Sequence, residues 1–173
     1  MQSRLAIALA ATLLISPAFV PSAFAAGGGG NTQTCPGGKV RDSNGKCVDP
    51  KQGMLDDDTL YENGAALAKA GRYGDAITVL GYIQNKADPR VLNYLGYAHR
   101  KSGRIQVGLG YYEEALRIDP NFVLTREYLG EAYLTLGDLA SAKNQLNEIE
   151  KRCGKGCDEY TALASQIAQF NKS

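Results

Sequence analysis

The sequence contains few of the residues that catalysis and cofactor binding most often use. Its 173 residues include no tryptophan and a single histidine, His99. No glycine-rich phosphate loop is present, no cluster of histidine, cysteine and aspartate has zinc-binding spacing, and no Cys-x-x-Cys-His motif could attach haem. These absences predict a protein that is not an enzyme and that needs no cofactor.

Neither sign of charge is in excess, and no long apolar run occurs beyond the N-terminal segment. The chain has 19 basic and 18 acidic residues, of which the N-terminal segment contains only Arg4. A net charge near zero argues against a general nucleic-acid-binding protein, because such proteins carry a basic excess. We expect the mature chain to bind no nucleic acid and to have no membrane span.

Residues 1–25 have the pattern of a secretory signal peptide. Arg4 precedes an apolar run, Leu5–Ile15, which is followed by Pro17 and a small-x-small site that ends at Ala25. The run is too short for a membrane-spanning helix, which disfavours the alternative of an uncleaved anchor. We expect cleavage after Ala25, export to the bacterial periplasm and a flexible, glycine-rich leader at 26–34.

A small hairpin and linker are expected at residues 35–55. Asn44-Gly45 is the favoured centre of a two-residue hairpin turn, and Cys35 and Cys47 bracket it. In an oxidising compartment these cysteines are most simply a disulfide. A carbohydrate- or wall-binding knot is the functional alternative, which the absence of aromatic residues in the segment disfavours. We expect the hairpin to be independent of the remaining fold, so that deleting residues 26–50 leaves stability nearly unchanged.

The spacing of apolar residues in 89–120 predicts two short helices joined by a tight turn. Ser102-Gly103 separates them, because glycine accepts the left-handed conformation that ends a helix. Gly96 and Gly108 fall where the helices would cross, and they let the two backbones approach closely. Apolar side chains recur on one face of each helix: Val91, Leu92, Leu95 and Ala98 in the first, and Ile105, Leu109, Tyr112 and Leu116 in the second.

The same pattern returns 34 residues later and 32 residues earlier, so the chain has an internal repeat. Gly96 corresponds to Gly130 and to Gly64. This order of residues resembles the tetratricopeptide repeat family. His99 stands in place of an aromatic residue of the family pattern, and Gly108 in place of the usual alanine. The residues that carry the resemblance are Leu92, Leu95, Gly96, Gly103, Tyr112, Ala115 and Pro120.

The resemblance covers about residues 57–152 and implies an all-α fold, a right-handed helical solenoid of three helix pairs that follows the disulfide-closed hairpin. The first and second repeats are 32 residues apart, two fewer than the second and third. The turn between them is therefore expected to be tighter, with Asp88 capping a helix that starts at Pro89. The three repeats are expected at about 57–88, 89–122 and 123–152. Their first helices are expected at about 57–70, 90–102 and 123–136, and their second helices at 73–86, 105–118 and 139–152.

Residues 153–173 predict a cysteine-containing turn and a capping helix. Cys153 and Cys157 flank a glycine turn, and we expect them to pair locally, although four cysteines allow three connectivities. The alternative is a thiol-redox or metal-handling protein that uses this pair. The Cys-x3-Cys spacing, and its expected place after a helix and not at a helix start, disfavour redox activity. The apolar stripe of the capping helix is Tyr160, Leu163, Ala164, Ile167 and Phe170.

Two further features allow both a structural and a chemical interpretation. His99 occupies a packing position of the repeat, so a packed or half-buried histidine is expected in preference to a catalytic one. Asp56, Asp57 and Asp58 are expected to stabilise the positive N-terminal end of the first helix. A divalent-ion site is the alternative for this acidic run, but the spacing and the glycine of a calcium loop are missing.

In the family that the chain resembles, the first helix of each pair lines a concave groove that holds a peptide. The resemblance therefore implies a protein-binding adaptor or assembly factor. The basic and tyrosine side chains in the groove favour another protein or peptide, with acidic or carboxylate groups, as the partner. A solvated helix face without a ligand is the alternative. The groove residues that the repeat positions select are Tyr61, Arg90, Asn93, Tyr97, Arg100, Lys101, Glu127 and Glu131.

Overall fold

The computed structural model describes residues 34–52 and 55–171, and the expected signal peptide and nearly all of the expected leader lie outside them. The described part is mainly helical, as predicted, and begins with a two-stranded antiparallel hairpin. The elements are β1 (Val40–Arg41), β2 (Cys47–Val48), η1 (Pro50–Gln52), α1 (Asp57–Lys69), α2 (Tyr73–Gly81), α3 (Pro89–Lys101), α4 (Ile105–Ile118), α5 (Val123–Thr135), α6 (Leu139–Cys153) and α7 (Asp158–Phe170).

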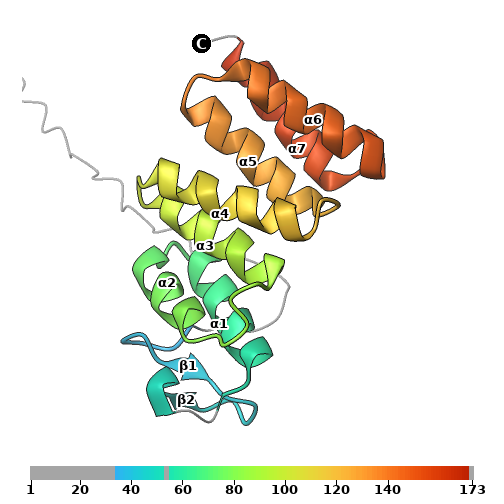
Figure 1. Cartoon of the computed structure of the whole chain (residues 1–173). Coiled ribbons are helices and arrows are strands. Elements are labelled where there is room, and N and C mark those ends of the chain that lie inside the picture. The colour runs from blue at the N-terminus through green and yellow to red at the C-terminus, as the bar shows by residue number, and fades with distance from the viewer. Residues whose placement is uncertain (1–33, 53–54, 172–173) are drawn as a thin grey trace, which may run out of the picture. The chain divides into compact units, whose positions relative to one another are not determined.

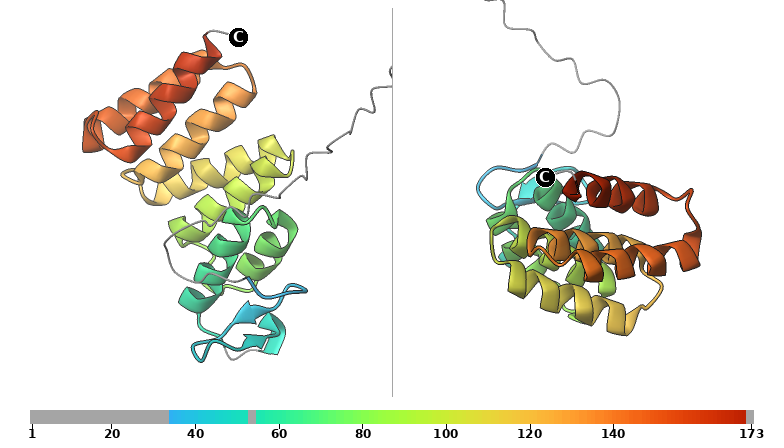
Figure 2. Two further views of the ribbon diagram at one scale, coloured as in Figure 1. Left: turned by 180° about the vertical axis from the view of Figure 1, so that it is seen from behind. Right: turned by 90° about the horizontal axis from the view of Figure 1, so that it is seen from above.

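The helices form three packed pairs, α1 with α2, α3 with α4 and α5 with α6, and α7 packs against the last pair (Figure 1). The first helices of neighbouring pairs also contact one another, α1 with α3 and α3 with α5, and α7 continues this series against α5 (Figure 2). We call α1, α3, α5 and α7 the A helices. The all-α solenoid of three helix pairs and a capping helix is thereby confirmed.

Glycines allow the paired helices to cross closely. A Cβ atom added at Gly96 would lie 2.6 Å from Cε1 of Tyr112, and one added at Gly108 would lie 2.8 Å from the carbonyl oxygen of Gly96. In the first pair, a Cβ atom at Gly64 would lie 2.5 Å from Leu80. The glycine-mediated crossing that the repeat predicts is therefore present in both pairs.

Replacing Gly96 with leucine is expected to lower the free energy of unfolding by about 1–3 kcal/mol, because the new side chain overpacks the α3–α4 contact. Urea denaturation followed by circular dichroism measures the change. Gly110→Leu is the matched control, because a Cβ atom at Gly110 in α4 would meet no atom within 4 Å. Equal denaturation midpoints for the two variants would contradict the packing role of Gly96.

The first inter-repeat turn differs from the prediction, because α2 ends at Gly81 and not near residue 86. The Asp57 carboxylate accepts hydrogen bonds from the backbone N–H groups of Gln84 and Asn85, at 2.8 and 2.9 Å, and thereby holds the turn. The turn ends at the predicted cap, where the Asp88 side chain accepts a hydrogen bond from the N–H of Arg90.

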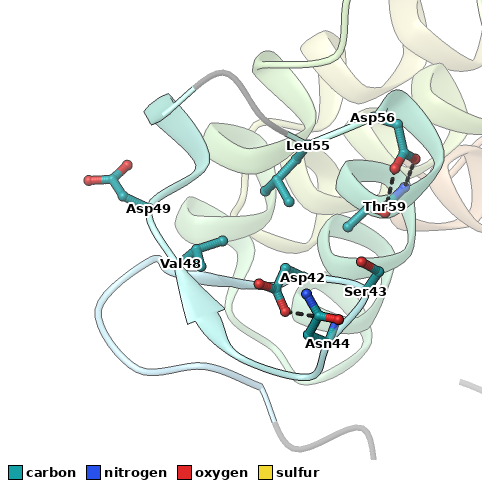
Figure 3. Close-up of a pocket in the computed structure, with 8 residues that line it drawn as sticks. All are labelled: Asp42, Ser43, Asn44, Val48, Asp49, Leu55, Asp56 and Thr59. Carbon is teal, nitrogen blue, oxygen red and sulfur yellow. Dashed lines mark hydrogen bonds between the residues drawn. The ribbon is translucent and has the colours of Figure 1, made fainter.

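The acidic run before α1 is used by the protein itself. Asp56 caps α1 by accepting hydrogen bonds from both the N–H and the hydroxyl of Thr59 (Figure 3). These hydrogen bonds lower the pKa of the Asp56 carboxyl group. Asp57 holds the turn after α2, and Asp58 lies 3.0 Å from Arg90. All three carboxylates therefore have protein partners, which favours the structural interpretation over an ion site.

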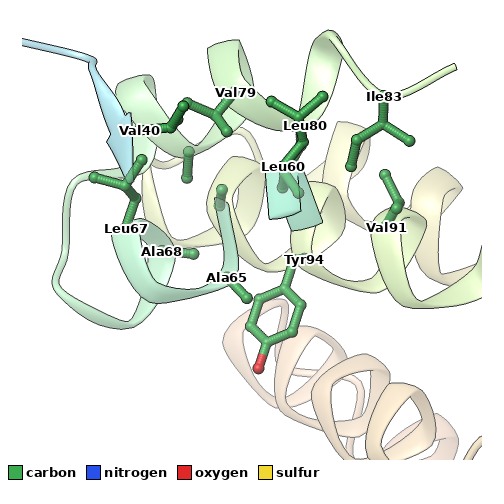
Figure 4. Close-up of a cluster of buried hydrophobic side chains, with 12 residues drawn as sticks. Val40, Leu60, Ala65, Leu67, Ala68, Val79, Leu80, Ile83, Val91 and Tyr94 are labelled. Carbon is green, nitrogen blue, oxygen red and sulfur yellow. The ribbon is translucent and has the colours of Figure 1, made fainter. Parts of the chain in front are cut away.

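The hairpin is part of the first hydrophobic core, which corrects the expectation that it is independent. Val40 of β1 has no exposed surface and packs among side chains of α1 and α2 that include Leu67 and Val79 (Figure 4). Asn63 of α1 accepts a hydrogen bond from the N–H of Arg41 and donates one to its carbonyl oxygen, at 2.7 and 2.9 Å. The hairpin covers the apolar end of the first helix pair, which would otherwise face water.

Each expected cysteine pair forms a disulfide in the structure, Cys35 with Cys47 and Cys153 with Cys157. The setting of the second pair differs from the prediction, because Cys157 occupies the N-cap position immediately before α7. The pair therefore lies between the end of one helix and the start of the next. The expected capping helix itself is present, with Leu163 buried against the last helix pair.

Candidate partner-binding face

A row of tyrosine rings crosses the A helices. Tyr61 of α1 and Tyr94 of α3 have ring centroids 5.9 Å apart, and Tyr94 and Tyr97 have centroids 6.3 Å apart. Tyr97 continues the row to Tyr128 of α5 at 5.0 Å. We call these four residues the tyrosine row and the surface that they cross the A-helix face. Tyr94 is only 5% exposed, so the contact area of the row comes mainly from the half-buried Tyr61, Tyr97 and Tyr128. Tyrosine combines an apolar ring with a polar tip, which suits a protein-binding surface.

An open pocket of about 560 Å³ lies beside the tyrosine row, between α1 and α3. Two rings of the row, Tyr61 and Tyr94, form part of its wall, and small alanine side chains of α1 leave the space. Glu62 and Lys69 add one charge of each sign. The lining residues are Tyr61, Glu62, Ala65, Ala66, Lys69, Ala70 and Tyr94.

Two lysines flank the tyrosine row with their ammonium groups over its rings. The Nζ atom of Lys69 is 5.6 Å from the Tyr94 ring centroid, and that of Lys101 is 5.7 Å from the Tyr97 centroid. Both side chains are exposed. Within residues 34–52 and 55–171, neither lysine forms an ion pair. They are therefore cations that a partner's carboxylates can reach.

Arg90, which was predicted to be a free basic residue of the groove, is already neutralised. Its guanidinium lies 2.6 Å from the Asp88 carboxylate and 3.0 Å from the Asp58 carboxylate. Hydrogen bonding from Arg90 lowers the pKa of the Asp88 carboxyl group. The guanidinium also lies 4.7 Å from the Tyr61 ring centroid, so Arg90 orders one end of the tyrosine row.

Arg100 is not a surface residue, which corrects its predicted role in the groove. It is only 8% exposed, and it forms an ion pair with Glu131 of α5. The Glu131 carboxylate also accepts a hydrogen bond from Gln166 of α7, so a buried polar chain links three successive A helices. Arg100 lies 3.4 Å from the hydroxyl of Tyr112 as well. A salt bridge to Glu131 thus replaces the partner's carboxylate that the sequence suggested.

Asn93 is fully buried, so the structure also removes it from the groove. Its Oδ1 atom accepts a hydrogen bond of 3.0 Å from the hydroxyl of Thr125, which is equally buried. The two residues lie 32 positions apart and join α3 to α5. The position of Asn93 along α3 directs its side chain towards α5 of the next repeat, and the residue type alone does not predict this direction.

The acidic end of the A-helix face centres on Glu127. Burial raises the pKa of the Glu127 carboxyl group to about 7, and the nearby charges of Glu131 and Glu159 act in the same direction. Arg100 opposes them. Glu127 therefore exchanges its proton near neutral pH.

The eight predicted residues thus divide into two groups. Tyr61, Arg90, Tyr97, Lys101 and Glu127 retain exposed surface along the A helices, whereas Asn93, Arg100 and most of Glu131 are taken into the contacts between helices. His99, at its packing position, is half-buried and stacks on Tyr111 with ring centroids 5.3 Å apart.

Three residues of this face were missed in the sequence, although the repeat contains a signal for them. Tyr94 and Tyr128 are separated by 34 residues, so one repeat step relates them. Lys69 and Lys101 are separated by 32 residues, which is the shorter step. Residues that recur at one repeat position fall on the same side of successive helices. Comparing repeat positions for polar as well as apolar residues would therefore have found the face.

Comparison with known proteins agrees with this architecture. The family description that matches is the tetratricopeptide repeat, over residues 89–122. None of the curated proteins that were compared matches the sequence. Among the helices that the structure describes, none is long and apolar enough to cross a bilayer.

Solved structures with this fold include domains in complex with peptides. The first tetratricopeptide-repeat domain of human RPAP3 has 18% identity, a TM-score of 0.60 and coverage of 72% of this chain and 95% of that chain. The corresponding domain of Spaghetti (RPAP3), bound to the HSP90 peptide SRMEEVD, has 20% identity, a TM-score of 0.58 and coverage of 73% and 98%. The Yersinia enterocolitica type III secretion chaperone SycD, with a peptide of the translocator YopD, has 20% identity, a TM-score of 0.56 and coverage of 66% and 88%.

Proposed function

We propose that the chain is a tetratricopeptide-repeat protein and acts as a non-enzymatic adaptor or assembly factor, which holds an acidic segment of a partner protein on the A-helix face. The observation that carries this proposal is the pair of exposed lysines, Lys69 and Lys101, which lie beside the tyrosine row and its pocket and form no ion pair with any residue that the structure describes. The RPAP3 and SycD structures in complex with peptides support a peptide as the kind of ligand.

The chemistry of the face suits an extended segment with both apolar and acidic side chains. The pocket between α1 and α3 accepts an apolar group against Tyr61 and Tyr94. Lys69 and Lys101, whose ammonium groups lie over the rings of Tyr94 and Tyr97, attract the carboxylates of the segment. Exposed charges contribute modestly one at a time, so the proposal requires both lysines to act together. Rising salt should weaken the complex, because exposed charges are screened.

We further propose that the protein works in the periplasm after cleavage at Ala25. The signal-peptide pattern of residues 1–25 supports export. The pairing of all four cysteines in disulfides also supports an oxidising compartment. Cell fractionation, with mass measurement of the mature N-terminus, tests this location.

The binding test compares matched charge variants of the mature chain. Tagged protein is used to capture partners from envelope extract, and the captured proteins are quantified by mass spectrometry. Lys69→Ala combined with Lys101→Ala is expected to reduce specific capture at least tenfold, because the two exposed lysines beside the tyrosine row are lost. Lys39→Ala combined with Lys143→Ala removes the same charge away from this face and should leave capture unchanged. Equal loss in both double variants would contradict the proposed site.

Arg90→Ala with Arg100→Ala, which the sequence suggests as the first test, is unsuitable. Arg100 is buried in a salt bridge, so its loss disturbs the fold as well as any binding. The lysine variants avoid this problem, because both side chains are exposed. Unchanged circular dichroism spectra should accompany the expected loss of capture.

A further inference from the structure

The turn between α6 and α7 brings three potential metal ligands together. Within residues 34–52 and 55–171, the sulfur atoms of Cys153 and Cys157 and a carboxylate oxygen of Glu159 lie within 4.8 Å of one another. The two sulfurs form a disulfide, and the cysteine Cα atoms are 5.9 Å apart. Two thiolates and a carboxylate are ligands that Zn²⁺ accepts in a tetrahedral site, with water in the fourth position.

Packed helices hold these ligands in place. Cys153 is the last residue of α6, Cys157 caps α7, and Glu159 lies in the first turn of α7. α7 is in turn anchored by buried Leu163 and Ile167. Two thiolates on one zinc ion lie about 3.8 Å apart, given Zn–S bonds of about 2.3 Å. The Cα separation of 5.9 Å is compatible with this distance, so the site requires rotation of the cysteine side chains and no displacement of the helices.

The charges around the turn are compatible with a cation. The two thiolates and the carboxylate carry three negative charges, and Zn²⁺ reduces the total to one. The remaining charge lies beside the positive N-terminal end of α7, which stabilises it. Lys155 is in the same turn, but its Nζ atom is 3.5 Å from the Glu150 carboxylate and is not paired with Glu159.

The two disulfides differ in their exposure to a reductant. Cys153 is exposed and Cys157 is partly buried, whereas Cys35 of the hairpin is only 3% exposed and Cys47 is partly buried. Thiol–disulfide exchange requires a thiolate to reach a sulfur atom, so a dithiol attacks the Cys153–Cys157 bond more readily. The attack forms a mixed disulfide with Cys153 and releases Cys157 as a thiolate. The second thiol of the reductant then displaces Cys153, and the dithiol leaves as its own disulfide.

We propose that reduction of the Cys153–Cys157 disulfide by a dithiol opens a zinc site formed by Cys153, Cys157 and Glu159. Zinc binding releases the thiol protons to solvent, so the exchange and the binding balance without a further oxidant. The site is separate from the A-helix pocket between α1 and α3 and does not depend on the proposed partner.

The test titrates the reduced full-length mature chain with zinc alone. The protein is treated with dithiothreitol, desalted without oxygen and titrated with Zn²⁺ in competition with a chromophoric chelator. We expect two free thiols and one bound zinc ion per chain, and no zinc binding before reduction. The Cys35→Ser/Cys47→Ser variant should retain this binding, whereas Cys153→Ser/Cys157→Ser should lose it.

The Glu159→Gln variant tests whether zinc is bound by three protein ligands or by the two thiolates alone. The variant keeps both thiols and should bind zinc at least tenfold more weakly, because the amide is a poorer ligand than the carboxylate. Glu150→Gln is the matched control and should bind zinc as the wild type does. Zinc binding no stronger than in Cys153→Ser/Cys157→Ser, equal affinity in Glu159→Gln, or loss of helicity on reduction would each overturn the proposal.

Discussion

Replacing Arg100 with alanine is expected to lower the free energy of unfolding by about 3–5 kcal/mol, which is the usual cost of removing one partner from a buried ion pair. The side chain of Arg100 is 7% exposed and that of its partner Glu131 is 14% exposed. The substitution leaves the Glu131 carboxylate without its guanidinium in a poorly solvated position. The substitution also removes the hydrogen bond that Arg100 donates to the hydroxyl of Tyr112.

Chemical denaturation of three variants tests this prediction. Lys101→Ala is the matched single control, because it removes the neighbouring but exposed cation and should change stability by less than about 0.5 kcal/mol. Arg100→Met combined with Glu131→Gln removes both charges and should recover much of the loss, since a buried pair is often replaceable by uncharged residues of similar volume. An Arg100→Ala variant as stable as Lys101→Ala would show that the pair contributes little.

The contrast between Arg100 and Gly96 shows what the sequence could predict. The repeat period predicted the crossing at Gly96 correctly, because a glycine at a helix contact lets the two backbones approach closely whatever the neighbouring residues are. The period also placed Arg100 on an A helix correctly, but it could not show that Glu131 lies within reach. Whether Arg100 reaches Glu131 depends on how one helix pair is shifted and rotated relative to the next, and side-chain packing determines this arrangement. Polar residues at helix contacts were therefore assigned to the surface.

A similar reason explains the error at the hairpin. The sequence predicted a hairpin around Asn44-Gly45 and a capping helix after Cys157, and both are present. It did not show that Val40 would enter the first core, because one valine in a polar segment has no periodicity. The hydrogen bonds between Asn63 and the Arg41 backbone join residues 22 positions apart, and such a contact leaves no local pattern.

Replacing Val40 with aspartate is expected to lower the free energy of unfolding by at least about 3 kcal/mol, because the substitution buries a carboxylate that has no partner. Val40 has no exposed surface, and its neighbours in the first core are apolar. The protein can avoid this burial by detaching β1 from α1. Detachment exposes the apolar end of the first helix pair and breaks the two hydrogen bonds to Asn63.

Val107→Asp is the matched control, since it makes the same chemical change at a valine of α4 that is 45% exposed. Denaturation measures the two losses, and hydrogen exchange locates them. In Val40→Asp, protection should fall most in α1 and α2, because a terminal cap in a helical array stabilises chiefly the pair that it contacts. Deletion of residues 26–50 should have a similar effect, in contrast to the expectation from the sequence. Equal stability of the two aspartate variants would show that the first helix pair is stable without the hairpin.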